Sequence, residues 1–168
     1  MFKSFSVWGL VFLAAGCGYR AEGIRGGVPL PRPVAVPFFE NDAAVPALSM
    51  SVTAATRGAL LRRGFKVISD PTQSPTTLIG RITRYERTPL SLDEKGRARE
   101  YRVAITAAYV LREGERRSPS RQATGASEYR TRSDAATEQS AEERAIREAA
   151  ERLAAQMADA IPFLSPLP

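Results

Sequence analysis

The sequence predicts an α+β domain in which two helices pack on one face of a mostly antiparallel or mixed four-stranded sheet. Residues 101–111 alternate with the period of two that is typical of a strand. Residues 46–63 and 140–161 each place apolar side chains along one side of a helix. Because the apolar sides of both helices and one face of the sheet must be buried, we expect a layer of helices packed on a layer of strands.

The N-terminal segment has the layout of a bacterial lipoprotein signal. Lys3 precedes an apolar run, and Cys17, the only cysteine, follows the small residues of 14–16. Because this run is too short to span a membrane, we interpret residues 1–16 as a signal peptide that is removed. Cys17 would then carry acyl chains, which together give stable anchoring. The alternative is an ordinary secreted protein with a free cysteine.

Composition limits the functions that are open to this chain. The sequence has no histidine, which removes the commonest general base and most zinc or iron sites, and one cysteine cannot form an internal disulfide. It also has no Gly-rich phosphate loop and no Ser-x-x-Lys motif. We therefore expect one domain with no enzymatic activity, no cofactor and no metal.

The net charge of +6, carried mainly by arginine, predicts an acidic partner. An exported, lipid-anchored chain meets anionic lipid, phosphorylated glycolipid and peptidoglycan, so we expect no nucleic acid. Arginine suits bidentate binding of phosphate. A basic surface without any specific ligand is the alternative.

The first half of the chain is predicted to hold a tether, a strand and a helix. Residues 17–32, rich in glycine and proline, read as a flexible tether between lipid and domain. Val34–Phe38 is an apolar run between prolines and predicts an edge strand, with a turn at 40–42. Pro46 suits the first turn of a helix, and Gly64 suits its end.

The second half predicts a hairpin and a closing helix. A brief strand at 65–68 and a loop at 69–76 lead into paired strands at 77–90 and 99–112, and a more polar strand follows at 121–130. The next helix is predicted to begin with a capping box, in which Ser140 and Glu143 satisfy backbone donors, and to end at Pro162. Its polar face mixes both signs of charge, which favours packing on the sheet over adsorption to a membrane. A proline-rich tail closes the chain at residues 163–168.

These residues together resemble the LptE family of lipopolysaccharide-assembly lipoproteins. The resemblance covers nearly all of the chain after the signal peptide, and its weight lies in the order and spacing of the matching stretches. The stretches are Gly16–Tyr19, Val34–Asn41, Gly96 through Glu100–Val103, and the closing amphipathic helix.

The resemblance implies a non-enzymatic outer-membrane lipoprotein with an LptE-like domain at residues 33–162. Members fold as two helices against a four-stranded sheet, plug and help to assemble the LptD barrel, and bind lipopolysaccharide on its way to the outer leaflet. Cys17 matches the lipidated residue of the family, and Gly18 replaces an aspartate that would favour inner-membrane retention. The five predicted sheet segments exceed four, so the strand at 65–68 is expected to be marginal.

The basic residues of the hairpin are our candidates for binding lipopolysaccharide. Lys95, Arg97 and Arg99 lie at and just after the predicted turn and form the expected primary contact. The alternative is that these charges keep exposed sheet edges soluble. The partner strand contributes Arg81, Arg84 and Arg87.

Two other functions remain open from the sequence. The Val34–Asn41 stretch would also suit a periplasmic lipoprotein that regulates a cell-wall synthase, or a component of a secretion pore. A carboxylate-based hydrolase is the second, although the neighbouring arginines would lower the carboxyl pKa values. Its candidate residues are Glu86, Asp93, Glu94 and Glu100.

Overall fold

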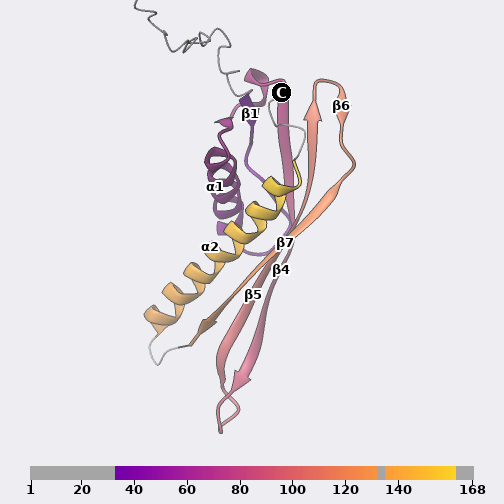
Figure 1. The fold of residues 1–168 in the computed structure, drawn as a ribbon. Helices are drawn as coiled ribbons and strands as arrows, with labels where there is room; N and C mark the ends of the chain where they lie inside the picture. The colour runs from indigo at the N-terminus through magenta and orange to yellow at the C-terminus, as the bar shows by residue number, and fades with distance from the viewer. Residues whose placement is uncertain (1–32, 132–134, 162–168) are drawn as a thin grey trace, which may run out of the picture.

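The structure, a computed structural model, describes residues 33–131 and 135–161. The predictions for the signal peptide, Cys17, the tether, Pro162 and the tail concern residues outside these ranges. The elements run in the order β1 (Pro33–Ala35), β2 (Glu40–Asn41), α1 (Ala47–Arg62), β3 (Lys66–Ile68), a 3-10 turn (Pro71–Gln73), β4 (Thr76–Leu92), β5 (Ala98–Glu113), β6 (Arg116–Arg117), β7 (Arg121–Arg130) and α2 (Ala135–Asp159) (Figure 1).

The α+β class with two helices and a mixed sheet is confirmed, but the sheet has seven strands and the predicted number of four was wrong. Its order is β3-β1-β4-β5-β6, with β2 also on β4 and β7 also on β5. Pairs among β1, β2, β3 and β4 are parallel, and the others are antiparallel. The additional strands arise because β1 and β2 use successive stretches of the β4 edge, while β6 and β7 share the β5 edge.

The predicted first strand is split because side chains of α1 bind its backbone. Val36 is the last residue to donate to β3, and its carbonyl accepts hydrogen bonds from Nε and Nη2 of Arg57 at 3.0 and 2.6 Å. Pro37 has no N–H to donate. The N–H of Phe39 donates to Oγ1 of Thr53 at 3.0 Å. Pairing therefore stops after β1 and resumes at β2, where the sequence predicted a turn.

Helix α1 agrees with the predicted range and ends as predicted. Gly64 adopts a positive φ of 83°, which glycine accepts without steric cost. The N–H groups of Gly64 and Phe65 donate to the carbonyls of Leu61 and Leu60, which is the Schellman pattern. Four of the five predicted apolar residues are fully buried and Ala55 is partly buried; the four are Leu48, Val52, Ala59 and Leu60.

Helix α2 begins at Ala135, so the predicted capping box at Ser140 was wrong. Ser140 lies in the second turn, where its hydroxyl donates back to the carbonyl of Ala136 at 3.0 Å. The helix extends because alanines favour it and because its first turn contacts the sheet through Glu138. The predicted apolar stripe is confirmed, since all its members are buried: Ala145, Ile146, Ala149, Leu153, Met157 and Ile161.

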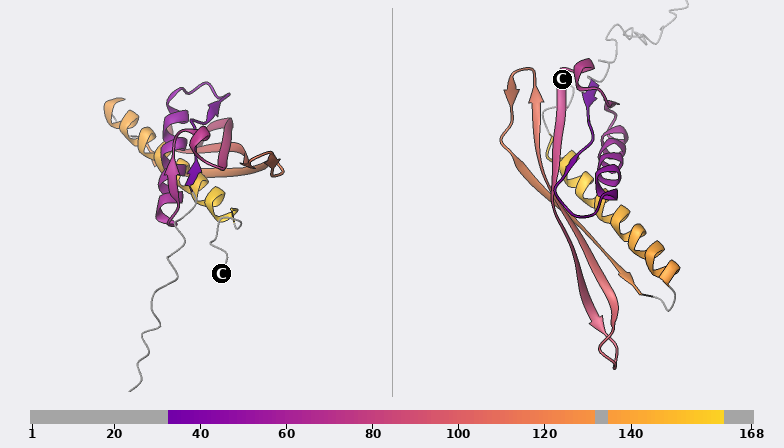
Figure 2. Two further views of the ribbon diagram at one scale, coloured as in Figure 1. Left: turned by 90° about the horizontal axis from the view of Figure 1, so that it is seen from above. Right: turned by 180° about the vertical axis from the view of Figure 1, so that it is seen from behind.

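Both helices lie on the same side of the sheet, as the two opposite views show (Figures 1 and 2). The core lies between them and the alternate residues of β5 that were predicted to share a face, including Val103, Ile105 and Ala107. Beyond Ile82, β4 leaves the core, and the β4–β5 hairpin projects past the helices to an exposed tip (Figure 1). Within the described ranges, neither helix is long and apolar enough to span a membrane.

Helix α2 rests directly on β7 and covers its outer edge. Gly125 faces the helix so closely that a Cβ atom would overlap the carbonyl oxygen of Ala149 and the backbone nitrogen of Leu153. Arg152 donates to the carbonyl of Ala126, and the N–H of Thr124 donates to Oε1 of Gln156 at 3.1 Å. These bonds occupy backbone groups that an open sheet edge would offer to another chain.

We expect Gly125→Ala to lower the free energy of unfolding by about 1–3 kcal/mol, because the added methyl must push α2 away from β7. Gly58→Ala is the matched control. There the new Cβ would lie 3.3 Å from Nη1 of Arg62, the movable end of a side chain, so helix propensity should stabilise the protein by about 0.5–1 kcal/mol. Urea unfolding followed by circular dichroism measures both. Equal stability of Gly125→Ala and the unmodified protein would contradict the close packing.

Candidate functional site

The tip of the β4–β5 hairpin is a compact turn organised by Asp93. Its Oδ1 accepts hydrogen bonds from the N–H groups of Lys95 and Arg97, each at 2.9 Å. Its Oδ2 lies 2.9 Å from Nε of Arg97 and 3.7 Å from Nε of Arg99. Gly96 takes a positive φ of 74° in this turn. The three basic residues predicted as the primary contact are thus held together at one exposed end of the molecule.

The charge of Asp93 is part of this arrangement. The backbone N–H of Arg97, supported by its side chain and by the N–H of Lys95, holds the pKa of Asp93 below its usual value. The carboxylate therefore stays ionised at neutral pH, and its bonds to the turn weaken only as the pH falls through this lowered pKa. Residues 93–99 keep a net positive charge because three cations outnumber the two carboxylates of Asp93 and Glu94.

Two leucines add apolar surface beside these charges. Leu90 and Leu92 are 46% and 62% exposed, although leucine side chains are usually covered. The base of the tip is fixed to the end of β7, because the N–H of Thr131 donates to the carbonyl of Arg99 at 2.9 Å. The tip therefore presents cations and apolar side chains together on a supported hairpin.

The other three predicted arginines do not join the tip. Arg81 pairs with Glu40 and lies 3.4 Å from Asp42, while Arg84 pairs with Glu86 at 3.0 Å. Arg81 and Arg84 are on the face of the sheet away from the helices, opposite Ala108 and Thr106. Arg87 faces the helices instead, because a register shift between Ile82 and Arg84 changes which residues share a face.

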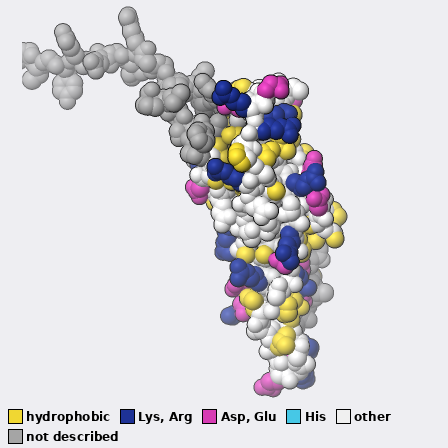
Figure 3. Space-filling model, turned by 90° about the vertical axis from the view of Figure 1, so that its right-hand side faces the viewer, with side chains coloured by type: hydrophobic (Ala, Val, Ile, Leu, Met, Phe, Trp, Pro, Cys, Tyr) yellow, Lys and Arg dark blue, Asp and Glu magenta, His cyan; other side chains and the backbone are white. Residues whose placement is uncertain are grey.

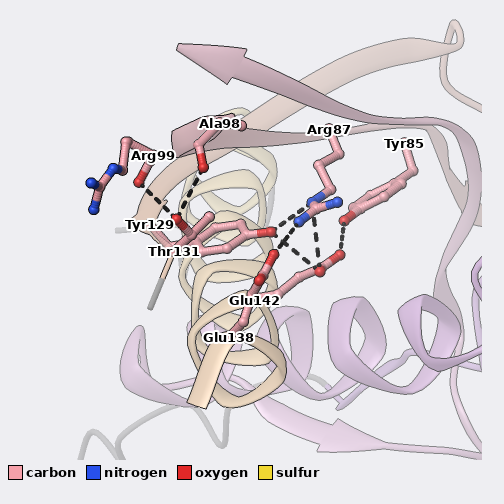
Figure 4. A network of polar contacts seen from close by, with 8 residues as sticks. All are labelled: Tyr85, Arg87, Ala98, Arg99, Tyr129, Thr131, Glu138 and Glu142. Carbon is pink, nitrogen blue, oxygen red and sulfur yellow. Dashed lines mark hydrogen bonds and ion pairs between the residues drawn. The ribbon is translucent and has the colours of Figure 1, made fainter. Parts of the chain in front are cut away.

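Arg87 is the centre of a polar network between the hairpin and α2 (Figure 4). Its Nε donates to the hydroxyl of Tyr129 at 2.6 Å, and its Nη2 donates to Oε1 of Glu138 at 2.9 Å. Its guanidinium carbon lies 3.7 Å from the ring centroid of Tyr101, which stacks on Tyr129 with centroids 5.6 Å apart. This cation therefore makes bonds within the fold, and it is 32% exposed.

Two tyrosines connect the network to Glu142. The hydroxyl of Tyr85 donates to Oε1 of Glu142 at 3.0 Å, and that of Tyr129 donates to Oε2 at 3.2 Å. Burial raises the pKa of Tyr129 to about 12, with Glu142 acting in the same direction and Arg87 against it. Burial and Glu142 also raise the pKa of Tyr85. Both hydroxyls therefore remain protonated donors at physiological pH. The sequence analysis did not predict this network. The only signal in the sequence is that Tyr85, Tyr101 and Tyr129 lie in three different strands.

Three of the four carboxylates considered for a hydrolase lie beside arginines, and the fourth, Glu94, is exposed in the turn after Asp93. Glu86 pairs with Arg84, Asp93 with Arg97, and Glu100 lies 3.6 Å from Arg130. A general acid needs a raised pKa, and that of Asp93 is lowered. Within residues 33–131 and 135–161 no cluster of three or more histidine, cysteine, aspartate or glutamate residues could hold a metal ion.

Comparison with known proteins connects this geometry to a family. The model of the LptE family, described as lipopolysaccharide-assembly, matches residues 32–161. No curated protein matches the chain.

Solved structures share the fold. A putative lipoprotein from Caulobacter crescentus superimposes with a TM-score of 0.53 at 14% identity, covering 75% of this chain and 89% of that chain. Rare lipoprotein B from Shewanella oneidensis gives a TM-score of 0.50 at 16% identity, with 76% and 89% covered. At these identities the similarity shows the fold.

We expect Arg87→Met to lower the free energy of unfolding by about 1–2 kcal/mol, because Glu138 and Glu142 lose their cation while the apolar stem is kept. Arg84→Met removes the same charge from the opposite face, where the arginine pairs only with exposed Glu86, and should change stability by less than about 0.5 kcal/mol. Thermal unfolding compares the two variants. Equal effects would mean that the network does not support the hairpin.

Proposed function

Because the chain belongs to the LptE family of lipopolysaccharide-assembly proteins, we propose that it binds lipopolysaccharide and plugs and helps to assemble an LptD-type β-barrel. In this proposal the protein is a non-enzymatic lipoprotein on the periplasmic side of the outer membrane. Acylated Cys17, which lies outside the described residues, is its anchor in the lipid.

The hairpin tip is the observation that supports lipopolysaccharide binding. Lipopolysaccharide combines phosphates on sugars with acyl chains, so a complementary site needs cations beside apolar surface. Lys95, Arg97 and Arg99 supply donors for phosphate, and Leu90 and Leu92 supply apolar contact a few residues away. No other place in the described chain brings three basic residues of one turn next to two exposed leucines.

The remaining predicted arginines take different parts in this proposal. Arg81 and Arg84 lie further along the hairpin on the helix-free face, where they are exposed but paired with carboxylates that a ligand phosphate would have to replace. Arg87 has a structural part, because its contacts to Tyr129 and Glu138 hold the hairpin against α2.

The helix-free face of the sheet supports the proposed contact with a barrel. Figure 3 views the molecule from the right-hand side of Figure 1 and shows uncharged areas with charged side chains of both signs scattered among them. A sheet face with short side chains can approach a second β-surface closely. The short side chains on this face include Ala104, Thr106, Ala108, Thr124 and Ala126.

Arg97→Gln with Arg99→Gln should weaken binding of lipopolysaccharide by about tenfold or more, because two phosphate donors are lost. The turn should persist, since Asp93 still accepts the backbone N–H groups of residues 95 and 97. Binding to immobilised lipopolysaccharide measures the affinity, and circular dichroism checks the fold. Arg112→Gln with Arg117→Gln is the matched control, with the same loss of charge far from the tip. Unchanged affinity of the tip variant would overturn the assignment of this site.

The barrel partner is tested by detergent extraction from the native envelope. A tagged full-length chain should bring down a large outer-membrane barrel, identified by mass spectrometry and by its shift on heating. The N-terminal peptide of the same sample should start at Cys17 and carry the added mass of acyl groups. Recovery of a cell-wall synthase, or of this chain alone as a ring, would contradict the plug and support the alternative functions.

A further inference from the structure

A second group of arginines lies at the β5–β6 turn, at the opposite end of the sheet from the tip (Figure 1). Arg112 and Arg117 stand directly opposite each other on neighbouring strands. Like charges in this position destabilise a sheet, so the pair has no evident use in folding. Arg116 and Arg117 are exposed, and none of the ion pairs in the described part of the chain involves Arg112, Arg116 or Arg117.

The end of α1 adds further cations at this end of the molecule. Arg62 and Lys66 are exposed and also take part in none of the described ion pairs, whereas neighbouring Arg63 pairs with Asp159. Carboxylates are present here too, but basic side chains outnumber them. The acidic residues at this end are Asp70, Glu113, Glu115 and Asp159, and the basic ones are Arg62, Arg63, Lys66, Arg112, Arg116, Arg117 and Arg121.

This end is also where the described chain begins. Pro33 pairs with Lys66, and its carbonyl accepts the hydroxyl of Ser74 at 2.5 Å. The N–H of Gly114 in the β5–β6 turn donates to the carbonyl of Pro75 at 3.0 Å, so the turn is tied to the same region. Residues 17 to 33 can span at most about 55 Å even when fully extended. A lipid attached at Cys17 would therefore keep this end within that distance of the membrane.

We propose that Arg62, Lys66, Arg112, Arg116 and Arg117, which we call the anchor-side basic face, bind anionic phospholipid headgroups of the leaflet that holds acylated Cys17. Charge complementarity identifies the partner, because basic residues near an anionic membrane surface are attracted to it within about a Debye length. The lipid anchor strengthens this weak attraction, because it holds the protein at the membrane and raises the effective concentration of the basic face near the headgroups.

The consequence is a defined orientation of the protein on the membrane. The long hairpin extends to the opposite end of the molecule (Figure 2), so with the anchor-side basic face on the headgroups it would point away from this leaflet and leave the tip free. The two basic ends then serve separate partners. This inference uses the lipid anchor of the proposed function but does not depend on lipopolysaccharide binding by the tip.

The test measures binding of an unacylated chain, residues 17–168 with Cys17→Ser, to lipid vesicles by co-sedimentation. This form keeps every described residue and removes the anchor, which would otherwise mask the contact. We expect binding to vesicles of phosphatidylcholine with 30% phosphatidylglycerol, little binding to pure phosphatidylcholine, and loss of binding in high salt.

Arg112→Gln, Arg116→Gln and Arg117→Gln together should weaken binding to the anionic vesicles by about tenfold or more. Lys95→Gln, Arg97→Gln and Arg99→Gln remove the same charge from the tip and should leave most of the binding intact. Circular dichroism checks both variants, and Arg62→Gln with Lys66→Gln, which leaves β5 and β6 unchanged, provides a second test of the same face.

Equal weakening by the two triple variants would overturn the proposal, because net charge alone would then explain adsorption. Equal binding to neutral and anionic vesicles would overturn it as well. If the tip variant keeps its affinity for lipopolysaccharide while the anchor-side variant loses vesicle binding, the proposed ligand site fails and this inference stands.

Discussion

The antiparallel pairing of β4 with β5 is the constraint on which the rest of the structure depends. It runs from Thr76 opposite Glu113 to Leu92 opposite Ala98. A two-stranded ribbon is marginal in water by itself, so its parts need different support. Near the core, β1 and β2 pair with β4. Nearer the tip, β7 on β5 is the only described strand that adds to the β4–β5 pair. The outer half therefore depends on β7 and on the contacts of Arg87 with the aromatic rings and α2.

The same ribbon explains why the charges form two groups. Apolar residues and both helices occupy the middle of the molecule, where an unpaired cation would pay a desolvation penalty. Basic side chains are concentrated at the two ends of the ribbon, far apart compared with the screening length in physiological salt, although exposed Arg102, Arg144 and Arg147 lie between them. Each end can therefore meet its own anionic partner. In the proposed function, this separation keeps the lipopolysaccharide site apart from the contact with the membrane.

The hairpin site was predictable from sequence only where its contacts are local. Lys95, Arg97 and Arg99 are close in sequence, and Asp93 within the same turn holds them, so their proximity follows from the turn. Arg81, Arg84 and Arg87 were grouped because they share one predicted strand. Regular alternation would place Arg84 opposite to the other two, whereas the register shift after Ile82 places it with Arg81 and turns Arg87 to the helices. A bulge depends on the partner strand, and no residue pattern within β4 alone indicates it.

The sequence by itself determined both amphipathic helices, the long hairpin, the Gly64 helix end and the family resemblance, because each depends on periodicity or on neighbouring residues. Tertiary structure decided the strand count, since the backbone of the first strand is taken by Thr53 and Arg57 from α1. It also decided where α2 begins and why residue 125 must be glycine, because both depend on how closely the helix meets the sheet. These contacts join segments far apart in the chain, and local propensity carries no information about them.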